Sequence, residues 1–325
     1  MHEWELVKRS IADYSELIRL LPRERRCFHV HGSFGDVYLQ CAALKERIEE
    51  HGPVSVIIDS KYKQLIAHGL GEDAFVVYAD GNAVNSIFHS IGVHSSRGFV
   101  PTRMLPTVYP FITECVLSGR LKYSDFLRVL VGSDKNGVFP GLEENLMLGD
   151  EASNILEEAG VPIGRTVLMC ADNNTQTELP ETFWLRVIAS INRLGLTPCL
   201  NDSGNLRSEG AKLLSGTDLK RIKVPPHLAV TLASYAGTYI TGNNGFATIQ
   251  ALFNHQTRGI HFINDFVMKD NMIPDKSGNE IPCKTFFHET VFGTAITGLQ
   301  IEELASPSND DLRLDNLIGS VFDRR

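Results

Sequence analysis

One stretch near the N-terminus constrains the fold of this 325-residue chain more than any other. Residues 27–50 begin with a short apolar run, continue through the tight loop 32–36, and end in a long segment with helical periodicity. The apolar face of that segment consists of Val37, Cys41, Leu44 and Ile48, and the opposite face is predicted to consist of Gln40, Lys45, Glu46, Arg47 and Glu49. Gly52-Pro53 ends it. A strand, a glycine loop and a helix in this order predict the start of an α/β sheet.

Asp36 stands where that helix begins, and two interpretations of it stay open. Its carboxylate can cap the helix by accepting hydrogen bonds from the first backbone N–H groups. It can also be a functional carboxylate at the carboxyl end of the first strand, where open α/β sheets bind ligands. Gly32 and Gly35 allow a sharp turn here and let a ligand approach the backbone closely.

Size and charge exclude several classes of protein. A chain of 325 residues predicts about two domains. The net charge of −8 and the absence of a basic run argue against nucleic acid as a partner. No apolar run approaches the roughly 20 residues that span a bilayer, and residues 1–10 lack the apolar core of a signal peptide, so we expect no transmembrane segment and a cytoplasmic location.

The six cysteines are expected to be reduced thiols of the core, because no two form a C-x-x-C pair. They are Cys27, Cys41, Cys115, Cys170, Cys199 and Cys283.

Strand-like and helix-like segments alternate in both halves of the chain, which predicts two parallel, doubly wound α/β sheets. The first half continues with predicted strands over 54–58 and 74–78, and the second half carries predicted strands over 166–171, 196–200, 238–241 and 259–263. We therefore predict an N-terminal domain over residues 1–160 and a C-terminal domain over 161–300. Residues 301–325 are predicted to end in an amphipathic helix that packs back across the domains.

Two polar loops in the second half follow predicted strands, as the loop 32–36 does in the first. Asn and Thr side chains in such loops can donate to phosphate oxygens without a metal, although Asn-Gly and Asn-Asn are also ordinary turn formers. If the two halves face one another, the three loops border one cleft. The polar residues are Asn173, Asn174, Thr175 and Gln176 in the first loop and Asn243, Asn244 and Gly245 in the second.

Three segments resemble the lipopolysaccharide heptosyltransferase-like glycosyltransferases, whose fold is the two-Rossmann arrangement called GT-B. Residues 32–47, GSFGDVYLQCAALKER, are similar to the GD-V-x-x-x-x-A-L start of that family. Residues 179–201 and 224–253 are similar in pattern to its donor-binding half. The resemblance covers about two thirds of the chain.

The resemblance implies an inverting, metal-independent sugar transfer with Asp36 as the general base. It implies a nucleotide-sugar donor and a glycan, lipid-linked or small-molecule acceptor, with no cofactor and no bound metal; a homo-oligomer stays open. The implied donor-binding residues are the seven of the two polar loops and Thr248, and the implied acceptor side consists of Gly32, Ser33, Phe34, Gly35 and Arg103. The family's donor loop carries an acidic residue, a hydroxyl, a glycine and then a histidine in the following helix. This chain has Asn244 directly before Gly245 and Thr248 near the histidine position, which leaves the donor sugar open.

Four other interpretations fit parts of the sequence. An NAD-linked oxidoreductase could use Asp59 for the ribose, but Tyr38 occupies the place of the third glycine of G-x-G-x-x-G. A sugar-nucleotide epimerase shares the fold and lacks an acceptor site. His29 and His31 could bind a metal, but packed strand histidines fit the pattern better. A non-catalytic nucleotide-sugar-binding protein would keep the fold without needing Asp36.

Overall fold

The protein forms two compact units in the computed structural model. Unit 1 consists of Met1–Glu143 with Thr290–Ala295, and unit 2 of Glu144–Glu289 with Ile296–Arg325. The sequence placed the boundary at residue 160. The structure describes residues 12, 15–17, 19–32, 34–63, 69–81, 100–101, 121–135, 147–171, 181–202, 219–242, 244–252, 257–263, 272–274, 280–282, 301–305, 315–316 and 318–320.

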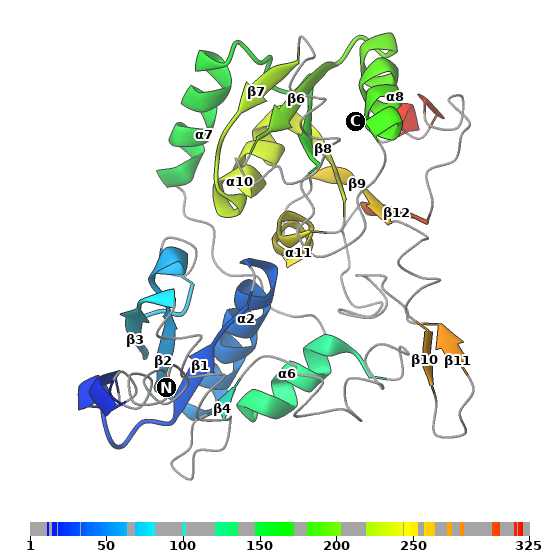
Figure 1. Ribbon diagram of the computed structural model, residues 1–325. Coiled ribbons are helices and arrows are strands. Elements are labelled where there is room, and N and C mark those ends of the chain that lie inside the picture. The colour runs from blue at the N-terminus through cyan, green and yellow to red at the C-terminus, as the bar shows by residue number, and fades with distance from the viewer. Residues whose placement is uncertain are drawn as a thin grey trace, which may run out of the picture. The chain divides into compact units, whose positions relative to one another are not determined.

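Unit 1 is built on a parallel sheet with the strand order β3-β2-β1-β4 (Figure 1). Every residue of β1 and β2 is buried, as expected for strands covered on both faces. Leu17, from the N-terminal helical segment, packs with Cys27, Ile57 and Val77. The strands are β1 (Cys27–Val30), β2 (Val54–Asp59), β3 (Ala74–Ala79) and β4 (Val100–Pro101), and the predicted strands 54–58 and 74–78 are confirmed.

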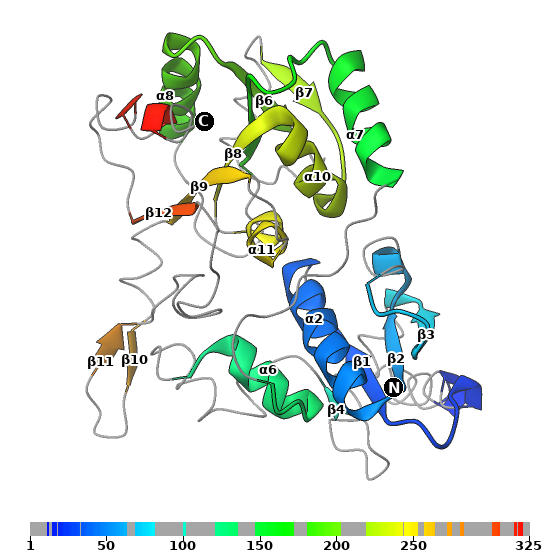
Figure 2. The same cartoon turned by 180° about the vertical axis from the view of Figure 1, so that it is seen from behind.

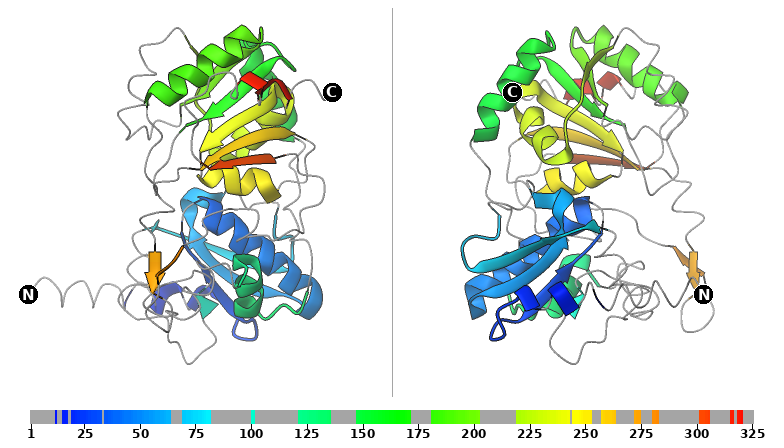
Figure 3. Two further views of the ribbon diagram at one scale, coloured as in Figure 1. Left: turned by 90° about the vertical axis from the view of Figure 1, so that its right-hand side faces the viewer. Right: turned by 60° about the vertical axis from the view of Figure 1, so that its left-hand side comes forward.

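Two helices of unit 1 lie side by side, α2 (Phe34–His51) and α6 (Tyr123–Val131) (Figure 3). The helix prediction for α2 is confirmed, but its predicted polar face is partly wrong. Gln40 and Glu46 are buried inside unit 1. Each has a polar partner elsewhere in the sequence, and a buried polar group is tolerated where its hydrogen bonds are satisfied.

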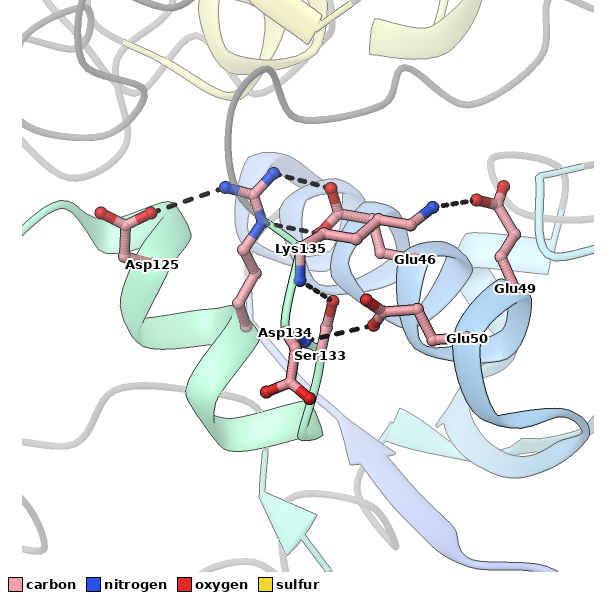
Figure 4. Close-up of polar contacts among 8 residues, drawn as sticks. Glu46, Glu49, Glu50, Asp125, Ser133, Asp134 and Lys135 are labelled. Carbon is pink, nitrogen blue, oxygen red and sulfur yellow. Dashed lines mark hydrogen bonds and ion pairs between the residues drawn. The ribbon is translucent and has the colours of Figure 1, made fainter.

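The partner of Glu46 is Arg128 of α6. Arg128 Nε donates to one carboxylate oxygen at 2.7 Å and Nη2 donates to the other at 2.6 Å, with both side chains at most 4% exposed. The pKa of Arg128 is raised, first by this hydrogen bond. Around it, Lys135 pairs with Glu49 and the Asp134 amide donates to Glu50 (Figure 4). The polar side of α2 thus holds α6 and the turn that follows it.

Unit 2 is built on a six-stranded parallel sheet with the order β12-β9-β8-β5-β6-β7. If these six strands are numbered 1 to 6 in chain order and read from β7, their order is 3-2-1-4-5-6, which is that of a Rossmann fold. The switch point, where the strand order reverses, lies between β5 and β8. In unit 1 the equivalent point lies between β1 and β4. The strands are β5 (Thr166–Cys170), β6 (Thr197–Asn201), β7 (Lys220–Ile222), β8 (Gly237–Gly242), β9 (Arg258–Ile263) and β12 (Ile301–Ala305).

Helices cover both faces of the unit 2 sheet (Figures 1 and 2). On one face, α8 (Glu181–Arg193) packs Trp184, Val187 and Ile191 against alternate strand residues such as Val167 and Met169. The opposite face meets α10 (Pro226–Ala236) and α11 (Gly245–Leu252), and α7 (Met147–Glu158) packs on α10. The predicted α/β class with parallel sheets is confirmed. A separate antiparallel pair consists of β10 (Met272–Pro274) and β11 (Glu280–Pro282).

The C-terminal segment differs in part from its prediction. Residues 301–305, which the sequence assigned to the C-terminal helical segment, instead form β12 and pair in parallel with β9, because tertiary pairing decides the state of such a short segment. Farther on, residues 318–320 are helical, as predicted, and Ile318 enters the core under α8. Asp315 accepts hydrogen bonds from Arg193 at 2.7 and 2.9 Å and from Ser190.

Within the described ranges, no helix has both the length and the apolar character to cross a bilayer. Four cysteines (Cys27, Cys41, Cys170 and Cys199) are buried free thiols, as predicted, and the other two lie outside those ranges. Burial raises the pKa of Cys27 to about 12, which keeps that thiol protonated and inert.

Gly259 is a position where a side chain cannot fit. It pairs with Tyr239 across β8 and β9, and a Cβ atom there would overlap the Tyr239 ring. That ring is fully buried against Phe246 of α11, and its hydroxyl lies 3.1 Å from His261 Nε2. We expect Gly259→Ala to lower the free energy of unfolding by about 1–3 kcal/mol through overpacking.

Urea denaturation of unit 2 measures this effect. Gly242→Ala is the matched control, because nothing lies within 4 Å of a Cβ atom at Gly242. Equal stability of the two variants would contradict the packing argument.

Candidate active site

The loop that leads from β1 into α2 brings Gly32, Phe34, Gly35 and Asp36 together at the carboxyl edge of the unit 1 sheet. Gly32 has φ 139°, a conformation that favours glycine. A Cβ atom at Gly32 would lie 2.6 Å from Asp36 Cβ and 2.8 Å from Asp36 Oδ2. The Asp36 carboxyl group therefore rests directly against the backbone of Gly32. Asp36 is the third residue of α2 and not the residue that precedes the helix.

Gln40 fixes the strand side of this loop. Its Nε2 donates to the His31 carbonyl oxygen at 2.8 Å, and the His31 amide donates to Gln40 Oε1 at 3.1 Å. The fully buried Gln40 side chain thus pairs with both backbone polar groups of His31, as a neighbouring strand would. The last residue before Gly32 is held by the helix that carries Asp36.

Tyr62 fixes the other side of the loop. It lies in the short 3-10 helix η1 (Ser60–Tyr62), which follows β2. Its hydroxyl donates to the Gly32 carbonyl oxygen at 2.5 Å, and its ring meets Phe34 edge-on with centroids 4.9 Å apart. The ends of β1 and β2 are joined in this way at the edge where Asp36 lies.

The equivalent edge of unit 2 carries Asn244, the residue before α11. Its Oδ1 accepts a hydrogen bond from the Ala247 amide at 3.0 Å, as an N-cap does. Its Nδ2 donates to the Cys170 carbonyl oxygen at 3.0 Å. The Thr241 hydroxyl lies 3.1 Å from the same carbonyl oxygen. The ends of β5 and β8, which flank the switch point, are therefore tied together at the N-terminus of α11.

The positive end of α11 and its first N–H groups suit an anion such as a phosphate. Of the predicted donor residues, Asn244 and Gly245 lie here, and Thr248 is on α11. The other predicted site residues lie outside the described ranges: Ser33, Arg103, Asn173, Asn174, Thr175, Gln176 and Asn243. That the loops of the two units border one cleft stays a prediction.

Specific contacts bear on two of the alternative interpretations, the metal site and the NAD-linked oxidoreductase. Burial, and then the neighbouring His31, lower the pKa of His29 to about 3, so His29 is a neutral strand residue. In the part of the chain that the structure describes, no three His, Cys, Asp or Glu side chains gather as metal ligands. Asp59, the candidate ribose acid, accepts from the Lys61 amide at 2.9 Å and pairs with Lys61 Nζ at 3.1 Å. Both oxygens of the Asp59 carboxylate are therefore already paired with Lys61 of η1.

Sequence reasoning missed Tyr62 and Gln40 as supports of Asp36, and Thr241 as a support of Asn244. Tyr62 is 30 residues away from its partner Gly32, and nothing in the local pattern links them. Gln40 carried a weak signal, because it is a polar residue one turn after Asp36 on a helix with a buried face.

No protein-family model and no curated protein matches this sequence. Solved structures do match over almost the full length. A glycosyl transferase family 9 protein from Veillonella parvula is 12% identical, with 93% of this chain and 92% of that chain covered and a TM-score of 0.56. E. coli ADP-heptose lipopolysaccharide heptosyltransferase II is 9% identical, with 92% and 99% covered and a TM-score of 0.58.

E. coli heptosyltransferase WaaC, solved with ADP-2-deoxy-2-fluoro heptose, is 11% identical, with 92% and 99% covered and a TM-score of 0.52. At these identities the likeness establishes the fold. The fold that the sequence resemblance implied is therefore confirmed.

Proposed function

We propose that this protein is a glycosyltransferase that moves a sugar from a nucleotide-sugar donor to an acceptor hydroxyl, with inversion and without a metal. One observation carries the proposal. The chain has the fold of heptosyltransferases, and Asp36 lies at the carboxyl edge of its sheet on a loop that hydrogen bonds from Gln40 and Tyr62 hold in place. A residue that only capped α2 would not need a loop fixed from both sides.

Asp36 is the general base in this proposal. The acceptor hydroxyl donates its proton to the Asp36 carboxylate while its oxygen attacks the anomeric carbon of the donor sugar. The bond between that carbon and the diphosphate oxygen breaks, and the nucleoside diphosphate leaves. Attack from the face opposite the leaving group inverts the anomeric centre.

The donor diphosphate belongs at the N-terminus of α11 in this proposal. Charge develops on the leaving oxygen as the sugar departs, and oriented N–H groups stabilise it without reorganisation. The Asn244 side chain bonds both the first turn of α11 and the end of β5, so it fixes the position of this helix N-terminus through backbone groups. The solved WaaC complex contains an ADP-sugar analogue, which supports a nucleotide sugar as the donor class.

A thermal-shift series with ADP, UDP, GDP and CDP tests the donor side. Binding to the native state alone stabilises it by about 2.7 kcal/mol at a ligand concentration 100 times the Kd. For a unit of this size that corresponds to a rise in Tm of about 5–10 °C. We expect one diphosphate to give this rise and the matching nucleoside to give a much smaller one.

Two outcomes would contradict the proposal. If no nucleotide or nucleotide sugar raises the Tm, there is no donor site. If a nucleotide sugar is converted to its epimer without an acceptor, and no sugar reaches any hydroxyl acceptor, the protein is an epimerase on this fold.

A further inference from the structure

We infer that Tyr62 is the positioning residue of Asp36: its hydrogen bond to the Gly32 carbonyl group selects the loop conformation that holds the Asp36 carboxylate in place. The inference deepens the proposed function and rests on it. Tyr62 acts through the loop and not on the substrate.

The loop needs such a partner because of its composition. Glycine populates many backbone conformations, so Gly32 and Gly35 do not define the path of the chain by themselves. Gln40 holds His31, which precedes the loop, through two hydrogen bonds. Tyr62 holds the Gly32 carbonyl oxygen itself. Rotation of the peptide plane that contains the Gly32 carbonyl group would break that hydrogen bond.

The Gly32 backbone is also what the Asp36 side chain rests on. A Cβ atom at Gly32 would be 2.8 Å from Asp36 Oδ2, so a shift of Gly32 by a fraction of an ångström changes the position of the carboxylate. Rates of proton transfer and attack depend on such distances, and a misplacement of 1 Å can lower a rate by about 100-fold. The Tyr62 hydroxyl thus affects the reaction indirectly, first through its hydrogen bond to Gly32 and then through the contact between Gly32 and Asp36.

Tyr62 is itself held firmly as a hydrogen-bond donor. It is only 2% exposed, and its ring meets Phe34 of the same loop. Burial raises the pKa of Tyr62 and outweighs the Lys61 ammonium that lowers it, while Asp59 and Asp36 raise it further. The hydroxyl therefore stays protonated. Asp59 caps η1 by accepting from the Lys61 amide at 2.9 Å, which fixes the turn that presents Tyr62.

Tyr62→Phe, with Tyr78→Phe as the matched control, tests the inference. The variant keeps the ring against Phe34 and removes the hydroxyl, and with it the bond to Gly32 and the hydrogen bond with Lys61, whereas Tyr78 is a half-buried tyrosine on β3. We expect Tyr62→Phe to lower kcat by about 10- to 100-fold, with the donor KM and the nucleotide-induced Tm rise unchanged. In an Asp36→Asn background we expect no further loss, because both changes remove one function.

Hydrogen exchange provides a readout that does not depend on turnover. Loss of one hydrogen bond is expected to make the amides of residues 34–38 exchange about 2- to 10-fold faster in Tyr62→Phe than in Tyr78→Phe. If wild-type protein transfers no sugar, the proposed function fails, while this comparison still decides whether Tyr62 fixes the loop.

Three results would overturn the inference: an unchanged kcat, an equal loss in the Asp36→Asn background, or unchanged exchange of the loop. If Tyr62→Phe unfolds, Asp59→Ala removes the acceptor that caps η1 and weakens the same turn without touching the ring, and the same expectations apply to it.

Discussion

Replacement of Asp36 by asparagine is expected to lower the rate of sugar transfer by about 10²- to 10⁴-fold, because the amide cannot accept the acceptor proton. Asparagine has the same shape, so the contact with Gly32 and the first turn of α2 are retained. The rise in Tm caused by the nucleoside diphosphate is expected to be unchanged. The measurement is kcat with saturating donor and acceptor.

Asp73→Asn is the matched control for this change. Asp73 is an exposed aspartate that precedes β3, so it lies at the amino end of the same sheet, away from the Asp36 loop. We expect its variant to have wild-type activity. Full activity of Asp36→Asn would refute the role of Asp36 as base, and the helix-capping interpretation would then be sufficient.

Glu46→Ala is expected to destabilise unit 1 by about 3–5 kcal/mol. The change leaves the Arg128 guanidinium buried without its bidentate partner, and an uncompensated buried charge is among the costliest defects in a protein. The distance from Arg128 to Asp125 is 3.5 Å, and Asp125 is half-exposed, so it replaces little of the lost interaction. Urea denaturation that is monitored on unit 1 measures the change.

Two further variants separate the buried pair from helix propensity. Glu49→Ala, on the same helix, removes the solvent-exposed pair with Lys135 and is expected to cost less than about 1 kcal/mol. The double variant Glu46→Leu with Arg128→Met removes both charges and is expected to recover most of the stability. A double variant as unstable as Glu46→Ala would mean that the charges themselves stabilise α6 on α2.

The parts of the fold that follow local patterns were predicted well. The run 54–58 is a buried strand because its residues are apolar without alternation, and α2 is a helix because its apolar residues recur at helical spacing. Alternation of strands and helices was enough to predict two parallel sheets. These features depend on residues close together in sequence.

Features that depend on distant partners were not predicted. Glu46 looked solvent-exposed because Arg128 lies 82 residues away, and residues 301–305 were not predicted as a strand because their partner β9 lies about forty residues earlier. Asp36 was predicted as a site residue because it follows a glycine loop at a strand end, and its role stays a prediction. Tyr62 was not, because a hydroxyl that reaches a carbonyl group across two strand ends has no local signature.

The position of β12 has a consequence for synthesis on the ribosome. Among the described strands it is translated last, yet it pairs with β9 and forms an outer edge of the unit 2 sheet. The nascent chain therefore presents β9 as an open edge while the later residues are still being added, at about 5–20 residues per second. An open strand edge can pair with another chain. During that interval β9 is the edge at risk of such pairing, and β12 covers it once it pairs with β9.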